Sequence, residues 1–198
     1  MSTTTSKRVP YRLVNVFCPT SSRLQGNALC VFEDGTGLTS DEMQGLALQF
    51  NLSETTFLFP PSTKHASKRA RIFTPGTELP FAGHPTLGSS FVTSKLDGTC
   101  TALETGAGII PVSNSGDVWS LKANKATFSP LSIPATTFAP LFSLTPEDFT
   151  SQIPYTTVNA GIPQLMLQLT STEALFRVTP PTTSAMDSLN SDGIFSSS

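Results

Sequence analysis

Glu54 and His84 are the residues of this sequence whose types and settings best suit acid–base chemistry. Glu54 stands between the expected end of a helix at Asn51 and an apolar, β-branched segment at 55–59. A carboxyl group at the mouth of such a strand is partly shielded from water, which makes it a more effective general acid or base. The alternative is an ordinary exposed acid at the start of a strand, and local spacing alone favours that alternative.

His84 stands between Gly83 and Pro85, and a glycine followed by a proline predicts the start of a helix. The free N–H groups of a helix N-terminus stabilise a bound carboxylate, and Gly83 would let such a ligand approach the backbone closely. The alternative is a histidine that caps the helix or packs in a loop. Asn27 follows Gly26 and could be a polar contact to a ligand, although its neighbours favour a turn.

The sequence contains none of the common signatures of metal or phosphate sites. Its two histidines, His65 and His84, and its three cysteines, Cys18, Cys30 and Cys100, do not have the spacing of a zinc site. The glycine-rich patterns of phosphate loops and dinucleotide folds are missing, as is the nucleophile elbow of serine hydrolases. We therefore expect no metal and no cofactor, and acid–base chemistry by carboxylate and imidazole remains the main enzymatic option.

Two helices and a set of strands are expected to position these residues. Thr39 and Glu42 form the pattern of a capping box, which predicts a helix that ends at Asn51. A second, buried helix is expected to begin at Gly83–Pro85 and to continue to Leu96, because this segment carries few charges. Strands are predicted at 11–17, 28–32, 55–59 and 69–74, and a β-meander at 99–122.

The composition changes after about residue 126. Pro, Ser and Thr are frequent in 129–157, and only 163–169 predicts a strand there. Residues 180–198 are expected to make few contacts, because their Ser, Thr and Asp side chains cannot offset the entropy of ordering. We expect a compact α+β domain at 1–125, followed by a connector and an incomplete unit at 126–198.

Charge and hydropathy limit the partners of the chain. A net charge of -2 over 198 residues gives no basic surface for nucleic acid. No apolar stretch approaches the length that spans a bilayer, and the polar start lacks the apolar core of a signal peptide. The scattered cysteines fit a reducing compartment. We therefore expect a cytoplasmic protein that binds neither membranes nor nucleic acid.

Four motifs occur in order along the first part of the chain. They are Asn-Leu-Ser-Glu-Thr at 51–55, Arg-Ile-Phe-Thr-Pro at 71–75, Glu-Leu-Pro-Phe-Ala-Gly-His-Pro-Thr-Leu-Gly at 78–88 and Leu-Glu-Thr-Gly-Ala-Gly at 103–108. Together they resemble the signatures of the PhzF-like phenazine biosynthesis family, in the same order. The Gly-Asn-Ala turn at 26–28 is similar to an early turn of that family. Any one motif alone would be a weak signal, whereas four in order are a strong one.

The resemblance implies a fold like that of diaminopimelate epimerase, in which each of two lobes wraps a curved mixed sheet around a central helix. It also implies that Glu54 carries a proton, that His84 assists, and that Gly83 and Asn27 contact the substrate. The expected reaction is an isomerisation of a small carboxylic acid without a cofactor. The epimerases use two cysteines instead, and the corresponding loop here has none.

The sequence departs from the family pattern after residue 126. The acidic loop of the second lobe, which resembles Glu-Asp-Pro-x-Thr-Gly-Ser-Ala in the family, has no counterpart here. We therefore expect residues 126–198 to hold only a truncated start of that lobe. The alternative function is a catalytically impaired relative that acts as a binding or interaction module. An exposed apolar edge where the second lobe would dock would favour a homodimer.

Overall fold

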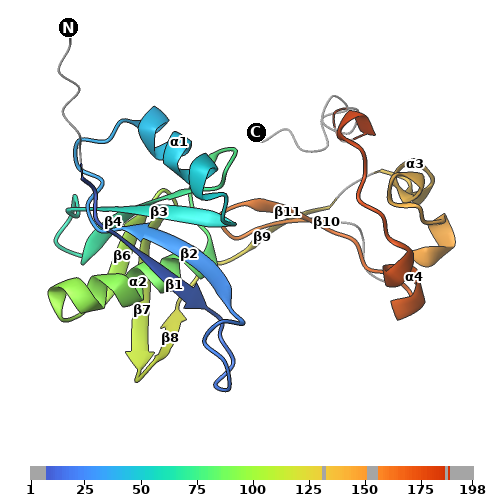
Figure 1. Cartoon of the computed structure of the whole chain (residues 1–198). Coiled ribbons are helices and arrows are strands. Elements are labelled where there is room, and N and C mark those ends of the chain that lie inside the picture. The colour runs from blue at the N-terminus through green and yellow to red at the C-terminus, as the bar shows by residue number, and fades with distance from the viewer. Residues whose placement is uncertain (1–7, 131–132, 151–155, 186, 188–198) are drawn as a thin grey trace, which may run out of the picture. The chain divides into compact units, whose positions relative to one another are not determined.

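The computed structural model describes residues 8–130, 133–150, 156–185 and 187. The chain divides into two compact units, Met1–Asn124 and Lys125–Ser198 (Figure 1). Each unit has its own sheet and its own apolar core.

The first unit is built on a mixed sheet with strand order β1-β2-β3-β4-β6-β7-β8, and the short strand β5 lies beside β4. Two neighbouring pairs, β2 with β3 and β4 with β6, are parallel, and the other pairs are antiparallel. The predicted strands and meander are confirmed, and the ends of the first four strands differ from expectation by one residue. The strands are β1 Tyr11–Val16, β2 Asn27–Phe32, β3 Glu54–Phe59, β4 Lys68–Phe73, β5 Glu78–Leu79, β6 Ala102–Thr105, β7 Gly108–Ser115 and β8 Val118–Leu121.

Helix α1, Ser40–Phe50, begins and ends where the sequence predicts. The Thr39 hydroxyl accepts a hydrogen bond from the Glu42 amide, and the Glu42 carboxylate accepts one from the Thr39 amide, which is the expected capping box. Asn51 ends the helix with a left-handed backbone. Buried residues of α1 pack against one face of the sheet, in a cluster with Cys30, Phe57 and Phe73.

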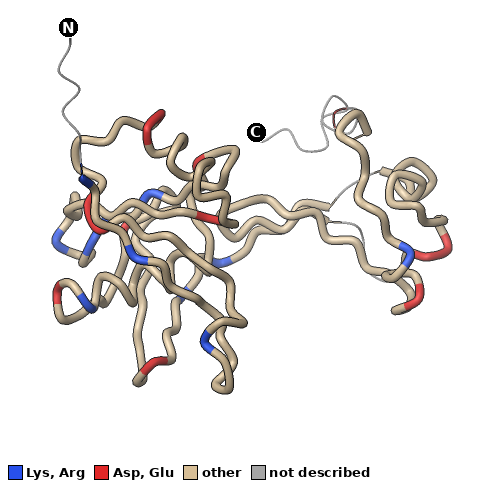
Figure 2. The backbone as a smooth tube through the Cα atoms, viewed as in Figure 1, with Lys and Arg blue, Asp and Glu red and all other residues tan. Residues whose placement is uncertain are grey.

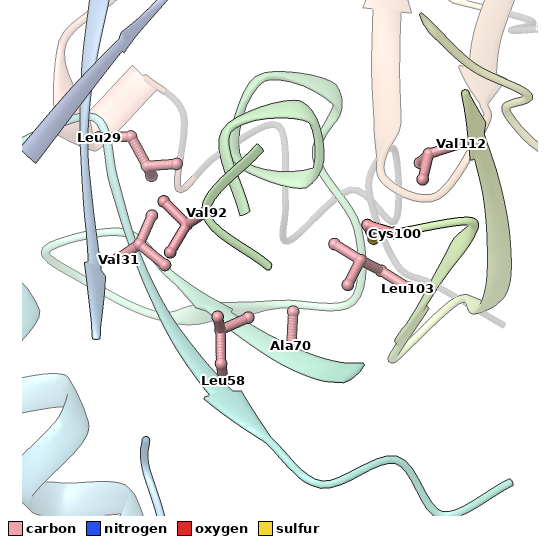
Figure 3. Packing of buried hydrophobic residues seen from close by; sticks show 8 residues of the cluster. All are labelled: Leu29, Val31, Leu58, Ala70, Val92, Cys100, Leu103 and Val112. Carbon is pink, nitrogen blue, oxygen red and sulfur yellow. The ribbon is translucent and has the colours of Figure 1, made fainter. Parts of the chain in front are cut away.

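Helix α2, Gly83–Asp97, covers the other face of the sheet and is buried along most of its length, as expected. Figure 3 shows Val92 of α2 pointing toward Val31 of β2, beside Leu29. Since successive residues of a strand point to opposite faces, Leu29 and Val31 face α2 while Cys30 faces α1. The first unit is thus an α+β lobe in which a mixed sheet wraps around α2.

Gly88 lets α2 lie very close to the first two strands. A Cβ atom on Gly88 would stand 2.5 Å from a methyl group of Leu29 and 3.0 Å from one of Val16. Nearby, the Ser89 hydroxyl bonds the Thr56 hydroxyl of β3 at 2.8 Å, so that both buried groups are satisfied. Small and polar residues therefore seat α2 on the sheet, which explains why its sequence does not show a strong apolar stripe.

The second unit holds an antiparallel three-stranded sheet in the order β11-β10-β9 and a small core around Phe138 and Phe149. The prediction that only 163–169 forms a strand in this region was wrong. Two further strands, β9 and β10, were not predicted. All residues of β9 are exposed and β10 is largely polar, so neither shows an alternating apolar pattern. The elements are β9 Thr127–Pro130, α3 Ala135–Phe138, η1 Ala139–Phe142, η2 Pro146–Asp148, β10 Thr156–Asn159, β11 Pro163–Met166 and α4 Thr172–Arg177. The expectation for 180–198 lies largely outside the described residues.

Charged residues of the first unit are spread over separate elements, with basic and acidic ones interspersed (Figure 2). Within the basic run at 64–71, Lys68 pairs with Asp97 and Arg71 pairs with Glu78. Among the described residues, no helix is both long and apolar enough to cross a membrane.

Candidate active site

Glu54 lies at the start of β3, on the face that α2 covers. Its neighbour in the parallel strand β2 is Leu29. Since every second residue of a strand shares a face, Glu54 points the same way as Thr56 and Leu58, which contact α2 or its core cluster. The strand therefore directs the carboxylate toward the beginning of α2.

His84 is the second residue of α2, and its side chain is 8% exposed. Its Nδ1 atom lies 2.7 Å from Oε2 of Glu54, and its Nε2 atom lies 3.1 Å from the main-chain oxygen of Asn27. Three residues that the sequence singled out, 27, 54 and 84, are thus brought into direct contact across three elements. Glu54 keeps 19% of its side chain exposed, so the pair can be reached from solvent.

The two hydrogen bonds of His84 determine where its hydrogens lie. A carbonyl oxygen can only accept, so Nε2 must donate to Asn27 and must carry a hydrogen. If Nδ1 and the carboxylate were both without a proton, their lone pairs would face each other across 2.7 Å. The short contact therefore requires one proton between Nδ1 and Oε2, either on the imidazolium or on the carboxylic acid. We call this proton-sharing pair, Glu54 with His84, the dyad.

Asn27 supports the dyad with its main chain. It is the first residue of β2, and its side-chain oxygen accepts a hydrogen bond from the Ser53 hydroxyl at 3.1 Å. Ser53 precedes Glu54, so this bond ties the start of β3 to the residue whose carbonyl holds His84. The sequence did not single out Ser53, although it lies in the motif at 51–55.

Gly83 begins α2, and no side chain caps the first turn of this helix. Apart from its chain neighbours and its own helix backbone, no described residue has an atom within 4 Å of a Cβ placed on Gly83. The backbone at this point is therefore open on the side where a side chain would stand, directly before His84. A carboxylate placed there would meet the positive end of the α2 dipole.

Phe17 is a neighbour of the dyad that the sequence did not reveal. It was expected to be the last residue of a strand at 11–17, but β1 ends at Val16 and Phe17 has a left-handed backbone with φ 61. Its ring centre lies 6.3 Å from that of His84, and the residue is 67% exposed. Local sequence gives no signal for this position, because the contact depends on how α2 meets the end of β1.

Within the described parts of the chain, no group of three or more His, Cys, Asp or Glu side chains could hold a metal ion. A groove of about 500 Å³ lies elsewhere, beside α1, and Tyr11, Leu46 and Phe50 are among its lining residues. It contains neither residue of the dyad. A carboxyl group and an imidazole in hydrogen-bond contact, as in the dyad, are groups that can take up and release protons.

Comparison with known proteins agrees with this fold. The sequence profile of the family described as phenazine biosynthesis-like protein (PhzC-PhzF) matches residues 14–198. The chain belongs to this family. The expected fold is also confirmed, because solved PhzF-family structures and a probable proline racemase share the diaminopimelate epimerase-like architecture.

Two relatives named as isomerases are similar in sequence to this chain, one over most of its length and the other over about half. An uncharacterized isomerase of Pasteurella multocida is 39% identical over 169 residues, which are 83% of this chain and 56% of the relative. A trans-2,3-dihydro-3-hydroxyanthranilate isomerase of Pseudomonas aeruginosa is 42% identical over 102 residues, which are 51% of this chain and 36% of the relative. The chain thus spans about half or less of the length of these relatives.

The solved structure of a predicted epimerase from Pseudomonas aeruginosa superposes with a TM-score of 0.77 at 31% identity, over 94% of this chain and 67% of the other. A PhzF-family protein from Bacillus anthracis superposes with a TM-score of 0.69 at 24% identity, over 88% of this chain and 60% of the other. The second likeness bears on the fold alone.

Proposed function

We propose that this PhzF-family chain is an isomerase that moves a proton between two carbon atoms of a small carboxylic acid. The observation that carries the proposal is the 2.7 Å contact between Glu54 and His84. Relatives named as isomerases support the reaction class. The substrate, the role of each site residue and the independence from a cofactor are parts of the proposal.

Glu54 would carry the transferred proton. Its Oε2 atom is bonded to His84, and among the described residues its Oε1 atom has no partner, so Oε1 can face the substrate. With the shared proton on His84, the carboxylate takes a proton from an activated carbon, and the electron pair of the broken C–H bond enters the conjugated system. The same oxygen then returns the proton to a second carbon on the same face, which leaves no net change in protons.

Three neighbours would support this transfer by stabilising and orienting the reacting groups, namely His84, Asn27 and Gly83. An imidazolium beside Glu54 stabilises the carboxylate, and the Asn27 carbonyl fixes the orientation of the ring. The open backbone at Gly83 would hold the carboxylate of the substrate at the start of α2. Placement of these groups matters more than their strength, because positioned acid–base groups contribute about 10²–10⁴-fold.

The proposal is tested by following deuterium from solvent into a panel of small unsaturated carboxylic acids. Glu54→Gln keeps the size of the side chain but cannot carry a proton, so exchange should fall by about 10²–10⁴-fold. Glu33→Gln is the matched control, because Glu33 is paired with Arg12 and lies outside the dyad. His84→Ala should reduce exchange less than Glu54→Gln does.

Two results would contradict the isomerase proposal. One is exchange by Glu54→Gln at the rate of the unchanged chain. The other is the absence of exchange with every acid of a broad panel, under conditions in which the protein is folded.

Binding without turnover is the second candidate. Large apolar residues are exposed on β1 and the loop that follows it, namely Leu13 at 62%, Phe17 at 67% and Leu24 at 87%. Exposed apolar side chains of this kind suit contact with a protein partner or with a second copy of the chain. A chain that forms a stable homodimer in sedimentation but exchanges no proton would favour this candidate.

A further inference from the structure

Phe17 adopts a backbone conformation that its residue type disfavours. Among the described residues, three other than glycine have positive φ, and they are Phe17, Asn51 and Ser143. Asn51 and Ser143 each end a helix, where a left-handed residue satisfies the last carbonyl groups. Phe17 follows the last residue of β1 and does not cap a helix. A strained residue of this kind persists where the surrounding structure imposes it, and such residues gather at functional sites.

Burial does not compensate for the strain at Phe17. The residue is 67% exposed, and it belongs to neither core cluster of the first unit. The loop behind it is held in place locally, because the Cys18 thiol lies 3.4 Å from the carbonyl of Asn15 and 3.3 Å from that of Arg23. The backbone thus keeps a large aromatic ring at the surface instead of turning it into the core.

The exposed ring lies at the dyad. Its centre is 6.3 Å from that of the His84 ring, and the two planes are tilted by 39°. A ligand that approaches the dyad from the side of His84 would therefore meet an apolar face next to the imidazole. Binding sites commonly combine apolar walls with a few polar groups that fix orientation.

We propose that Phe17 is a specificity-determining residue of the dyad site, where its ring selects acids that carry an apolar face next to the reacting carbon over small polar acids. This inference rests on the proposed function, since it assumes that the dyad binds a carboxylic acid. An aromatic wall favours an apolar ligand because contact removes apolar surface of both from water. A small hydroxy acid has too little apolar surface to gain from the same contact.

The test compares the affinities of two probes, cyclohex-1-ene-1-carboxylate and lactate, by NMR titration of the His84 ring signals. The sequence has two histidines, so His65→Gln assigns the signals. Phe17→Ala should weaken binding of the cyclohexene acid by about tenfold, the scale of a lost apolar contact in a specificity pocket. Its affinity for lactate should change less than about twofold, and Phe17→Leu should restore part of the preference.

Leu48→Ala is the matched control, because Leu48 is an exposed apolar residue, at 61%, on α1, which packs against the other face of the sheet. It should leave both affinities unchanged. Phe17→Gly relieves the positive φ, so it should be at least as stable as Phe17→Ala while the preference is still lost. A purely structural role for the ring predicts the opposite, with stability lost and the affinity ratio preserved.

The inference is overturned if Phe17→Ala keeps the affinity ratio of the unchanged chain, or if the unchanged chain does not prefer the cyclohexene acid. The deuterium exchange experiment with Glu54→Gln decides the proposed function separately. Preferential binding of the cyclohexene acid without deuterium exchange would refute the proposed isomerase function and support the role of Phe17. Exchange without preferential binding would support the isomerase function and refute the role of Phe17.

Discussion

At the scale of single residues, β3 places polar groups on both faces of the sheet, and the two faces differ in whether these groups find a hydrogen-bond partner. Glu54 and Thr56 face α2, where each finds a partner in His84 or Ser89. Thr55 faces the cluster around α1 together with Phe57, and its buried hydroxyl has no hydrogen-bond partner among the described residues. A buried hydroxyl without a partner lowers stability, while a paired one is costly to remove.

Valine substitutions at Thr55 and Thr56 should therefore have opposite effects. Valine matches threonine in shape, so Thr55→Val should leave the free energy of unfolding unchanged or raise it by about 1 kcal/mol. Thr56→Val leaves the Ser89 hydroxyl buried without a partner and should lower it by about 1–3 kcal/mol. Urea denaturation of both variants checks the prediction, and a larger loss from Thr55→Val than from Thr56→Val would contradict it.

The acidity of the buried thiols also belongs to the residue scale. Burial raises the pKa of Cys30 from 9.0 to about 12, and burial raises the pKa of Cys100 as well. Since the thiolate is the reactive form, iodoacetamide should modify Cys18 in the folded protein and reach Cys30 and Cys100 only after unfolding. Peptide mass spectrometry reads the three sites separately, and early modification of Cys30 would contradict the packing of the sheet.

The same shift makes stability depend on alkaline pH. Above pH 9.0 the unfolded chain loses a proton from Cys30 that the folded protein keeps until about pH 12. The unfolded state then binds fewer protons than the folded state, so the free energy of unfolding falls as pH rises through this window. Cys30→Ala should make that decline shallower.

At the scale of elements, a glycine in each of two helices allows the effect of packing on stability to be measured separately from the effect of helix propensity. Gly88 of α2 touches β1 and β2, whereas a Cβ atom on Gly45 of α1 would meet nothing within 4 Å. Alanine is the better helix former at both positions, so any difference between the two substitutions reports the close approach of α2 to the sheet.

Gly45→Ala should raise the free energy of unfolding by about 0.5–1 kcal/mol. Gly88→Ala should lower it by about 1–3 kcal/mol, because the new methyl group overlaps Leu29 and Val16. Thermal unfolding of the two variants in parallel is the measurement. A Gly88→Ala variant as stable as Gly45→Ala would mean that α2 does not rest on the sheet as described.

Much of the first unit could be predicted from its sequence because its signals are local. The capping box at Thr39 and the apolar run after Glu54 each define an element without reference to the rest of the chain. The contact between Glu54 and His84 could not be derived in this way, since it depends on β3 and α2 meeting across 30 residues. Only the resemblance to a family indicated that the two residues act together. Phe17 remained hidden because its conformation depends on tertiary structure.

At the scale of the whole molecule, the two units differ in how they are held together, and so in how well their sequences predict them. The first has two apolar clusters on opposite faces of one sheet. The second has a smaller core around Phe138, and its strand β9 is exposed throughout. Strands such as β9 and β10 form through main-chain pairing between distant segments, which leaves little trace in local sequence.

The proposed chemistry depends on the proton that Glu54 and His84 share, and ¹⁵N NMR of the His84 ring tests this most directly. Near neutral pH, the spectrum of the unchanged chain should show a hydrogen on Nε2, because the Asn27 carbonyl accepts it. The Nδ1 signal should report the hydrogen that Nδ1 shares with Glu54, and Glu54→Gln should change this signal while Nε2 keeps its hydrogen. An Nε2 atom without a hydrogen, or a ring spectrum that Glu54→Gln leaves unchanged, would contradict the account of the dyad.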